Sequence, residues 1–316
     1  MNEFGFELTL CATLESPDRV VARQLGAAVR GRRIVDVVVV EPGPEFDRRA
    51  AITPETIPPR AIESDVGPGR ARRVTDAFDC HPERARAVAD RAVEVGFFER
   101  DRDGIGGPAV RQAVRYPDWF DRLVAVENKP DLDRPGDLAD QLRTDVSLGV
   151  FDEVVLATAT HVTGAHRNRL SPEVGVWEFD PATGDREVVR EATPLSPGEP
   201  GVELLDRDAT RAEVRPVTAT EKARLRRAIA ERAYGKGWRT YDLPACAECS
   251  PGDRGLPRCE WKGRVVRPVE ECGPDCGGHE TADPPDVDAD ALRAARNAWE
   301  PDPEGVATRQ AGLDQF

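Results

Sequence analysis

The stretch RLVAVENKPDLDRPGDLADQL, residues 122–142, determines which fold the sequence predicts. Its first half is an apolar run that predicts a buried strand and ends in Glu127-Asn128-Lys129, and its second half predicts a helix. Side chains two positions apart on a strand point to the same face, so we expect Glu127 and Lys129 to lie together. Burying such a charged pair costs free energy that an apolar residue would not cost. The end of this strand is therefore a candidate functional site.

The segments around this stretch predict an α/β protein. A strand from residue 123, a helix over 136–148 and a strand over 153–159 follow one another with short links, which indicates a right-handed parallel crossover. A strand over 33–41 carries a single acid, Asp36, and a helix over 218–235 starts at Thr218 or Thr220. The other expected elements are helices over 3–15, 17–31, 82–96 and 288–299, hairpins over 97–116 and 174–192, and irregular structure over 42–79.

The composition indicates a cytoplasmic protein. The 316 residues carry a net charge of −14, and only four of the 44 basic residues are Lys. Abundant acids with few lysines are typical of a high-salt cytoplasm, where salt also screens repulsion from phosphates. The chain has no apolar run of 18 residues, which excludes a membrane span, and its first residues have no basic stretch of a secretory signal. Lys129 is informative because lysine is so rare here.

Carboxylates that converge with a lysine are the groups that metal-dependent phosphodiester cleavage needs. Such a reaction uses two or three carboxylates on Mg²⁺ and a cation that orients water or stabilises the transition state. Glu127 and Lys129 supply two of these groups, and Asp36 on the neighbouring strand would supply a second carboxylate. Glu7 lies on the apolar face of the first helix and would supply a third. Otherwise, Glu127 and Lys129 form a surface ion pair and Asp36 caps a bulge.

The order of these elements resembles the core of the PD-(D/E)xK nuclease superfamily. The resemblance implies a restriction-endonuclease-like mixed sheet, with Asp36 and Glu127 binding Mg²⁺ or Mn²⁺ and Lys129 catalytic. Glu7 would match the helix carboxylate of the resolvase-like branch, and Gln141 the polar helix position of the RecB-like branch. Pro117-Asp118 also precedes Glu127, so the second metal ligand is ranked Asp36 first, then Asp118, then Asp121. The whole chain also resembles an uncharacterised family of haloarchaeal proteins.

Residues 45–116 separate the two parts of this core, 1–44 and 117–240, and are therefore an insertion. Their helix and hairpin resemble the end of a winged-helix module, whose Arg84, Arg86 and Arg91 would contact DNA. Arginine is the common cation of this chain, so a structural insertion is the preferred interpretation. His81, His161 and His166 have no partners at metal-ligand spacing and are interpreted as surface or core residues.

The segment 241–282 has the spacing of a metal site. Pairs of Cys two to four residues apart can clamp one tetrahedral ion, and four thiolates suffice for structural Zn²⁺. The candidate ligands are Cys246, Cys249, Cys259, Cys272, Cys276 and His279. The resemblance to RecB-like nucleases implies, as the alternative, an iron-sulfur cluster that also uses Cys11, although Cys11 on an apolar helix face also fits a buried hydrophobic residue.

The polar tail, 283–316, ends in RQAGLDQF, where Gln310, Leu313 and Phe316 lie on one side of a helical turn. This resembles the clamp-binding box of replication and repair proteins, which implies the DNA sliding clamp as a partner. The leading hypothesis is a Mg²⁺-dependent DNA nuclease of PD-(D/E)xK type, active in repair or replication and tethered to the clamp. The alternative is a non-catalytic adaptor that binds nucleic acid or the clamp.

Overall fold

The computed structural model describes residues 2–101, 107–207 and 210–305, and it confirms a mixed α/β protein. A six-stranded sheet forms its centre, with strand order β1-β2-β6-β7-β8-β9. β6 pairs in parallel with β7, and β7 with β8, whereas the other neighbours pair antiparallel. The strands are β1 (Val20–Gly26), β2 (Ile34–Pro42), β6 (Phe120–Asn128), β7 (Glu153–Thr158), β8 (Gly175–Phe179) and β9 (Arg186–Arg190).

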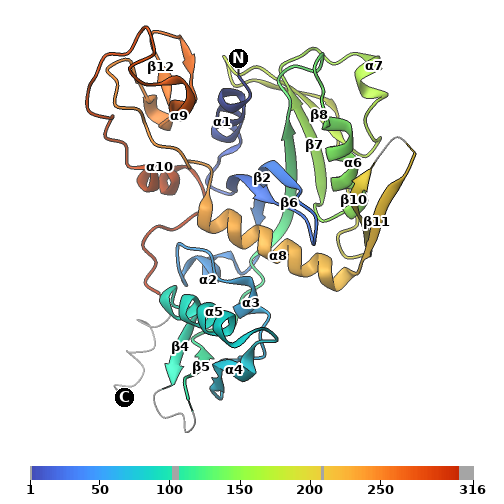
Figure 1. The fold of residues 1–316 in the computed structure, drawn as a ribbon, viewed down its shortest axis with the longest axis vertical. Helices are drawn as coiled ribbons and strands as arrows, with labels where there is room; N and C mark the ends of the chain where they lie inside the picture. The colour runs from blue at the N-terminus through green and yellow to red at the C-terminus, as the bar shows by residue number, and fades with distance from the viewer. Residues whose placement is uncertain (1, 102–106, 208–209, 306–316) are drawn as a thin grey trace.

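Helices cover both faces of this sheet (Figure 1). Helix α1 (Glu3–Leu14) packs on one face, where Phe6 and Leu10 meet Val37 and Val126. Helices α6 (Leu138–Leu148) and α8 (Ala219–Lys236) pack on the other face. The crossover from β6 through α6 to the parallel strand β7 agrees with the sequence prediction, as does the Thr218 cap of α8.

The predicted helix over residues 17–31 is wrong. Ser16 and Pro17 begin a turn, in which the Ser16 carbonyl accepts a hydrogen bond from the Arg19 amide at 3.1 Å. The chain then forms β1, whose residues Val20 and Val21 pair with β2 and are buried on opposite faces. β-Branched residues enclosed on both faces favour a strand, and this tertiary environment outweighs the local start signal of a helix.

The insertion folds around a hydrophobic core of its own. It contains helix α5 (Pro82–Glu94) and a three-stranded sheet of order β3-β5-β4. The predicted irregular stretch 42–79 is partly helical, because short helices contribute apolar residues such as Ala61 and Ala77 to this core. The remaining elements are α2 (Phe46–Ala50), α3 (Pro59–Ile62), β3 (Arg72–Arg73), α4 (Val74–Ala77), β4 (Phe98–Asp101) and β5 (Ala109–Gln112).

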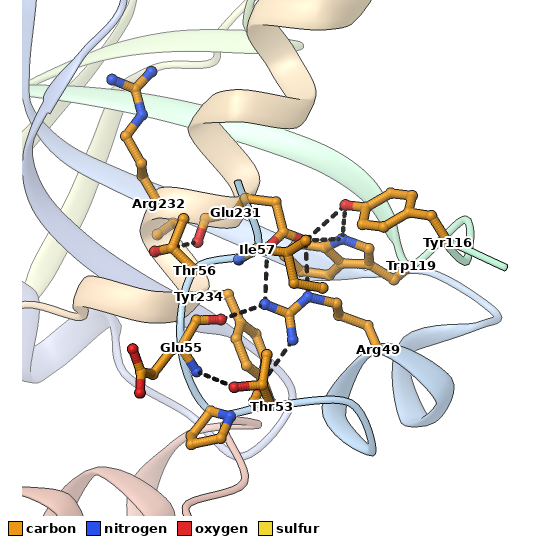
Figure 2. A network of polar contacts seen from close by, with 12 residues as sticks. Arg49, Thr53, Glu55, Thr56, Ile57, Tyr116, Trp119, Glu231, Arg232 and Tyr234 are labelled. Carbon is orange, nitrogen blue, oxygen red and sulfur yellow. Dashed lines mark hydrogen bonds and ion pairs between the residues drawn. The ribbon is translucent and has the colours of Figure 1, made fainter. Parts of the chain in front are cut away.

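A buried ion pair joins the insertion to the sheet domain (Figure 2). Arg49 of α2 donates to both carboxylate oxygens of Glu231 on α8, at 2.8 and 2.7 Å, and both side chains are fully buried. Glu231 also accepts hydrogen bonds from Tyr116 and Trp119. The remaining guanidinium protons of Arg49 reach the carbonyls of Thr53 and Glu55. The network satisfies two charges that neither part could bury alone.

The C-terminal part contains further short elements. The hairpin β10 (Gly201–Arg207) and β11 (Ala212–Val217) packs beside α6 and has no counterpart in the sequence prediction. The Cys-rich segment holds η1 (Gly252–Arg254), β12 (Arg258–Cys259), β13 (Arg264–Val265) and α9 (Pro268–Glu271), and α10 (Ala289–Arg296) follows it. No helix in the described residues is long and apolar enough to cross a membrane.

Candidate functional site

Three of the predicted acids lie at one end of the central sheet, and each comes from a different element. Asp36 lies near the start of β2, Glu127 near the end of β6, and Glu7 in the middle of α1. Because Val37 pairs with Val126 in antiparallel register, Asp36 stands opposite Glu127. Glu7 and Glu127 are 5% and 4% exposed, so their carboxylates lack the hydration that surface acids have.

On the α1 side of the sheet, two amide side chains join Glu7 to Asp36. The Gln24 amide donates to Glu7 at 2.7 Å and to Asp36 at 3.2 Å. The Asn128 side-chain amide donates to Glu7, and the Asn128 backbone amide donates to Asp36, both at 3.0 Å. Arg23 completes this side with an ion pair to Glu7. The two carboxylates therefore share the same polar neighbours.

Gln24 has an unusual backbone conformation. Its φ is +54°, and among the described residues it is the one non-glycine residue with a positive φ. Such a conformation costs free energy and persists only where the surroundings hold it in place. Here it accompanies the side-chain hydrogen bonds from Gln24 to Glu7 and Asp36.

Glu127 has different partners, on the α6 side of the sheet. Arg33 donates to Glu127 at 2.6 Å and to both oxygens of Asp145 on α6, at 2.6 to 3.2 Å. Asp145 is 2% exposed, and the Arg33 side chain is 8% exposed. One guanidinium thus serves two buried carboxylates, and among the described residues Glu127 bonds to Arg33 rather than to Gln24 or Asn128, although Asp36 lies close to it.

The electrostatics of the site follow from this burial. Burial raises the pKa of Asp36 to about 6, with Glu7 adding to the rise and the Asn128 amide opposing it. Burial, and then the nearby Asp36, raise the pKa of Glu127 to about 8, although Arg33 opposes both. Burial also raises the pKa of Asp145. The site carries more negative charge than its arginines compensate, which is an arrangement that favours binding of a cation.

Lys129 is separated from Glu127. It follows β6 and forms an ion pair with Glu3 in the first turn of α1. Its side chain is 23% exposed and that of Glu3 is 63% exposed, so the pair lies at the surface. The expectation that Glu127 and Lys129 lie together does not match these contacts, because Glu127 bonds to Arg33 and Lys129 to Glu3, while the Lys129 amide still donates to the Ala157 carbonyl of β7 at 2.9 Å.

The other predicted acids and Gln141 occupy different places. Asp118 and Asp121 lie at the opposite end of β6, six or more residues from Glu127, which is roughly 20 Å along a strand. This distance rules them out as partners of Glu127 on one metal ion. Gln141 is half-buried on α6, and no side-chain hydrogen bond joins it to the described residues. Asp145, one turn further along α6, is the residue that reaches the site.

In the Cys-rich segment, four thiols lie near enough to influence one another electrostatically. Cys249 and Cys259 are bridged in antiparallel fashion, and the Cys249 amide donates to the Cys246 carbonyl at 3.0 Å. Burial and the nearby Cys272, Cys246 and Cys259 raise the pKa of Cys249 to about 11. Cys276 lies further along the chain, with its carbonyl bonded to the His279 amide. In the described residues, no group of three or more His, Cys, Asp or Glu side chains is arranged to hold a metal ion.

Two predictions remain, namely Cys11 as a cluster ligand and the clamp-binding box of the C-terminal tail. Cys11 is fully buried on the side of α1 that faces the core, and its electrostatic neighbours are Glu7, Arg23, Glu15 and Asp36 rather than other thiols. This position agrees with a buried hydrophobic role and argues against a cluster ligand. Gln310, Leu313 and Phe316 lie outside the described residues.

Sequence reasoning missed five residues of the site, namely Arg23, Gln24, Arg33, Asn128 and Asp145. Asp145 had a signal, because it continues the apolar helix face of Leu138 and Leu142, as Glu7 does on α1. Asn128 lies between the predicted residues Glu127 and Lys129 in the sequence but was not itself predicted to belong to the site. Gln24 and Arg33 reach the site through pairing of β1 with β2, which the sequence prediction did not contain.

The comparisons with known proteins give one match. A family model described as a family of unknown function (DUF5787) matches residues 20–281, which is well over half of the chain. No curated protein and no solved structure matches the chain.

Proposed function

The chain belongs to DUF5787, a family of unknown function, and from the residues of its own site we propose that it is a divalent-metal-dependent DNA nuclease of the PD-(D/E)xK type. The single observation that carries the proposal is the meeting of Glu7, Asp36 and Glu127 at one end of the sheet. These acids come from α1, β2 and β6, which is the distribution that the resemblance to the superfamily implies. The order α1-β1-β2-β6-α6-β7, with a parallel crossover at its end, supports the same proposal.

The kinds of oxygen at the site fit a hard divalent cation, although no three acidic side chains of the described residues are arranged around one point. Its preferred ligands are carboxylate and amide oxygens, and the site offers both together with a buried amide oxygen that has no partner among the described residues, Oδ1 of Asn128. Asp36 and Glu7 would hold the ion, with Glu127 as a further candidate. When bound, the ion would supply charge neutralisation for the phosphate and a more acidic water.

The protein's own cations would bind the DNA backbone. The Lys129 ammonium pairs with Glu3 near the surface, so a phosphate can replace Glu3 as its partner at little cost. Lys129 would then orient the water or stabilise the charge of the transition state. Gln141, half-buried on α6, would have a supporting role at most.

The test is cleavage of labelled single-stranded and branched DNA in high salt with Mg²⁺ or Mn²⁺. Asp36→Asn and Lys129→Ala should each lower the rate by a factor of about 100 or more, because each removes charge needed at the transition state. Asp121→Asn is the matched control, since Asp121 is an exposed acid of β6 at the end far from Glu127 and Lys129. Cleavage that survives Asp36→Asn, or an inactive wild-type protein on every substrate, would refute the proposal.

One observation favours the second candidate, a non-catalytic nucleic-acid or clamp-binding adaptor. Glu127 forms an ion pair with Arg33, and Lys129 forms one with Glu3, so two residues of the motif already have partners within the chain. An inactive descendant of the fold would tolerate such pairs. DNA binding without cleavage, unaffected by Asp36→Asn, would favour this candidate.

For the Cys-rich segment we propose a structural Zn²⁺ held by Cys246, Cys249, Cys259 and Cys272. The mutual effects of these thiols on pKa support the choice, with Cys276, which also acts on Cys272, and His279, whose buried Nδ1 has no partner among the described residues, as alternative ligands. The four ligands would draw closer around the ion. Elemental analysis of the purified protein should find about one zinc per chain, lost in Cys249→Ser and retained in Cys80→Ser. Iron with visible absorbance would instead indicate the iron-sulfur alternative.

For the tail we propose the DNA sliding clamp as the partner of Gln310, Leu313 and Phe316. Such a segment gains affinity by inserting its aliphatic and aromatic side chains into a pocket of the partner. Calorimetric titration with the clamp should therefore show binding that Phe316→Ala abolishes. Equal affinity of the variant would contradict this assignment.

A further inference from the structure

The two sides of the acidic site differ in how completely their polar atoms are satisfied. On the α6 side, Arg33 bonds to Glu127 and to both oxygens of Asp145. On the α1 side, Oδ1 of Asn128 is buried without a hydrogen-bond partner in the described part of the chain. Asn128 is only 7% exposed, so water does not readily compensate this oxygen. A buried acceptor of this kind requires an explanation, and an unfilled cation position is one.

We propose that the divalent cation binds on the α1 side of β6, held by Glu7, Asp36 and the side-chain oxygen of Asn128. Glu127 is not a ligand in this arrangement and stays paired with Arg33. The inference deepens the proposed nuclease function, on which it rests for the role of the cation.

The contacts of Asn128 support this position. Its side-chain nitrogen donates to Glu7 and its backbone nitrogen to Asp36, both at 3.0 Å, so the amide lies beside both carboxylates. Rotation of the amide by half a turn would direct Oδ1 toward Glu7. Without a cation this rotation would set oxygen against oxygen, and with a cation it adds a ligand of the kind that Mg²⁺ and Mn²⁺ prefer.

Gln24 acts as a positioning residue in this arrangement. Its amide donates to one oxygen of Glu7 and one of Asp36, and so holds the two carboxylates near each other when no cation is bound. The left-handed backbone of Gln24 directs the side chain there and is the kind of strain that functional sites retain. Asp36 can bind a cation and still influence Glu127 through space, which explains why the two sides are electrostatically linked.

The experiment measures Mn²⁺ binding to the full-length, metal-depleted protein by loss of the electron paramagnetic resonance signal of free Mn²⁺. No DNA is present, so the result does not depend on cleavage. Asn128→Ala, Asp36→Asn and Glu7→Gln should each weaken binding by roughly 10-fold or more. Glu127→Gln should change it by less than about threefold, because it removes a nearby charge and no ligand.

Asn128→Asp separates a ligand role from a structural one. If Oδ1 binds the cation, the added carboxylate tightens Mn²⁺ binding, whereas the loss of the donor to Glu7 alone would weaken the fold and not improve binding. Asn168→Ala, at an exposed position after helix α7 (Gly164–Arg167), is the control and should match the wild type. Thermal unfolding of each variant identifies any that do not fold.

Each outcome bears on the inference. Weak binding by Glu127→Gln together with normal binding by Asn128→Ala would overturn it and return the cation to Glu127, while leaving the nuclease proposal intact. Absence of Mn²⁺ binding to the wild type would also overturn it. Binding that depends on Asn128 in a protein that cleaves no DNA would support the cation site and refute the nuclease.

Discussion

Two buried networks of arginine and carboxylate differ in a way that separates structure from function. In the first, shown in Figure 2, Arg49 and Glu231 have no exposed atoms. Glu231 accepts five hydrogen bonds, two from Arg49 and one each from Tyr116, Trp119 and the Ile57 amide. One positive charge meets one negative charge, and the donors fill the available acceptor positions. Such a network fixes the insertion on α8 and has no capacity for a ligand.

The second network, at the ends of β2 and β6, is unbalanced. Four carboxylates, those of Glu7, Asp36, Glu127 and Asp145, meet two guanidinium groups, those of Arg23 and Arg33. The pKa values of Asp36 and Glu127 are raised, and the Asn128 oxygen is unpaired in the described residues. A site that stabilised only the fold would gain from losing these acids. This imbalance is the observation on which the proposed cation site rests.

The largest effect is expected for Arg49→Leu, which breaks the balanced network. Removal of one partner leaves Glu231 charged and buried, so the free energy of unfolding should fall by about 3–5 kcal/mol. Denaturant unfolding measures this loss. Arg48→Leu is the control, since Arg48 is exposed and pairs with Glu45 at the surface. A loss below about 1 kcal/mol for Arg49→Leu would show that the balanced network is not the anchor of the insertion.

The matched change in the unbalanced network is Arg33→Leu, and its effect should depend on pH. Glu127 has its pKa raised to about 8, and that of Asp145 is also raised, so both acids can take up protons once Arg33 is gone. The loss should be about 3 kcal/mol at alkaline pH, where the acids are ionised, and clearly smaller near pH 5. Unfolding curves at the two pH values measure the difference. Equal losses would mean that Arg33 and Arg49 have the same structural role.

The core of the fold was largely predictable, because the spacing of apolar residues and the length of each apolar segment indicated which segments are strands and which are helices. The apolar run before Glu127, the helix of α6 and the strand β7 each carried a clear pattern, and the structure confirms them. β1 was not predictable in this way, since the Ser16-Pro17 signal and a short sequence suited a helix equally well. Its conformation depends on pairing with β2, which is a tertiary interaction.

The site was predictable only in part, for a related reason. Glu7, Asp36 and Glu127 stood out because each was an acid among apolar residues. Glu127 and Lys129 nevertheless contact different partners, Arg33 and Glu3, which the alternation of side chains along a strand did not predict. Arg33 has no distinguishing pattern in a chain rich in arginine, so its contacts with Glu127 and Asp145 emerge only from the three-dimensional structure.

A smaller effect, and a gain, is expected for Glu127→Gln in metal-free protein. A carboxyl group whose folded pKa is raised binds more protons when folded, so stability falls as pH rises from its usual pKa near 4.5 to about 8. Glutamine removes this term, which should increase the free energy of unfolding at pH 8 by an amount on the order of 1 kcal/mol and flatten its pH dependence. Thermal unfolding in chelator across this range measures both. A variant whose stability falls between pH 5 and pH 8 as steeply as that of the wild type would contradict the raised pKa.

The smallest effect is expected for Arg91→Ala, which removes an exposed ion pair at the margin of the balanced network. Arg91 of α5 pairs with Glu55, whose carbonyl accepts from Arg49, but the two charged side chains are 40% and 54% exposed. Water and salt already stabilise such charges, so the loss should stay below about 1 kcal/mol and shrink further in high salt. Denaturant unfolding at low and high salt measures it beside Arg49→Leu. A loss equal to that of Arg49→Leu would show that proximity to the network matters more than burial. The balanced and unbalanced networks would then differ only in their charge balance.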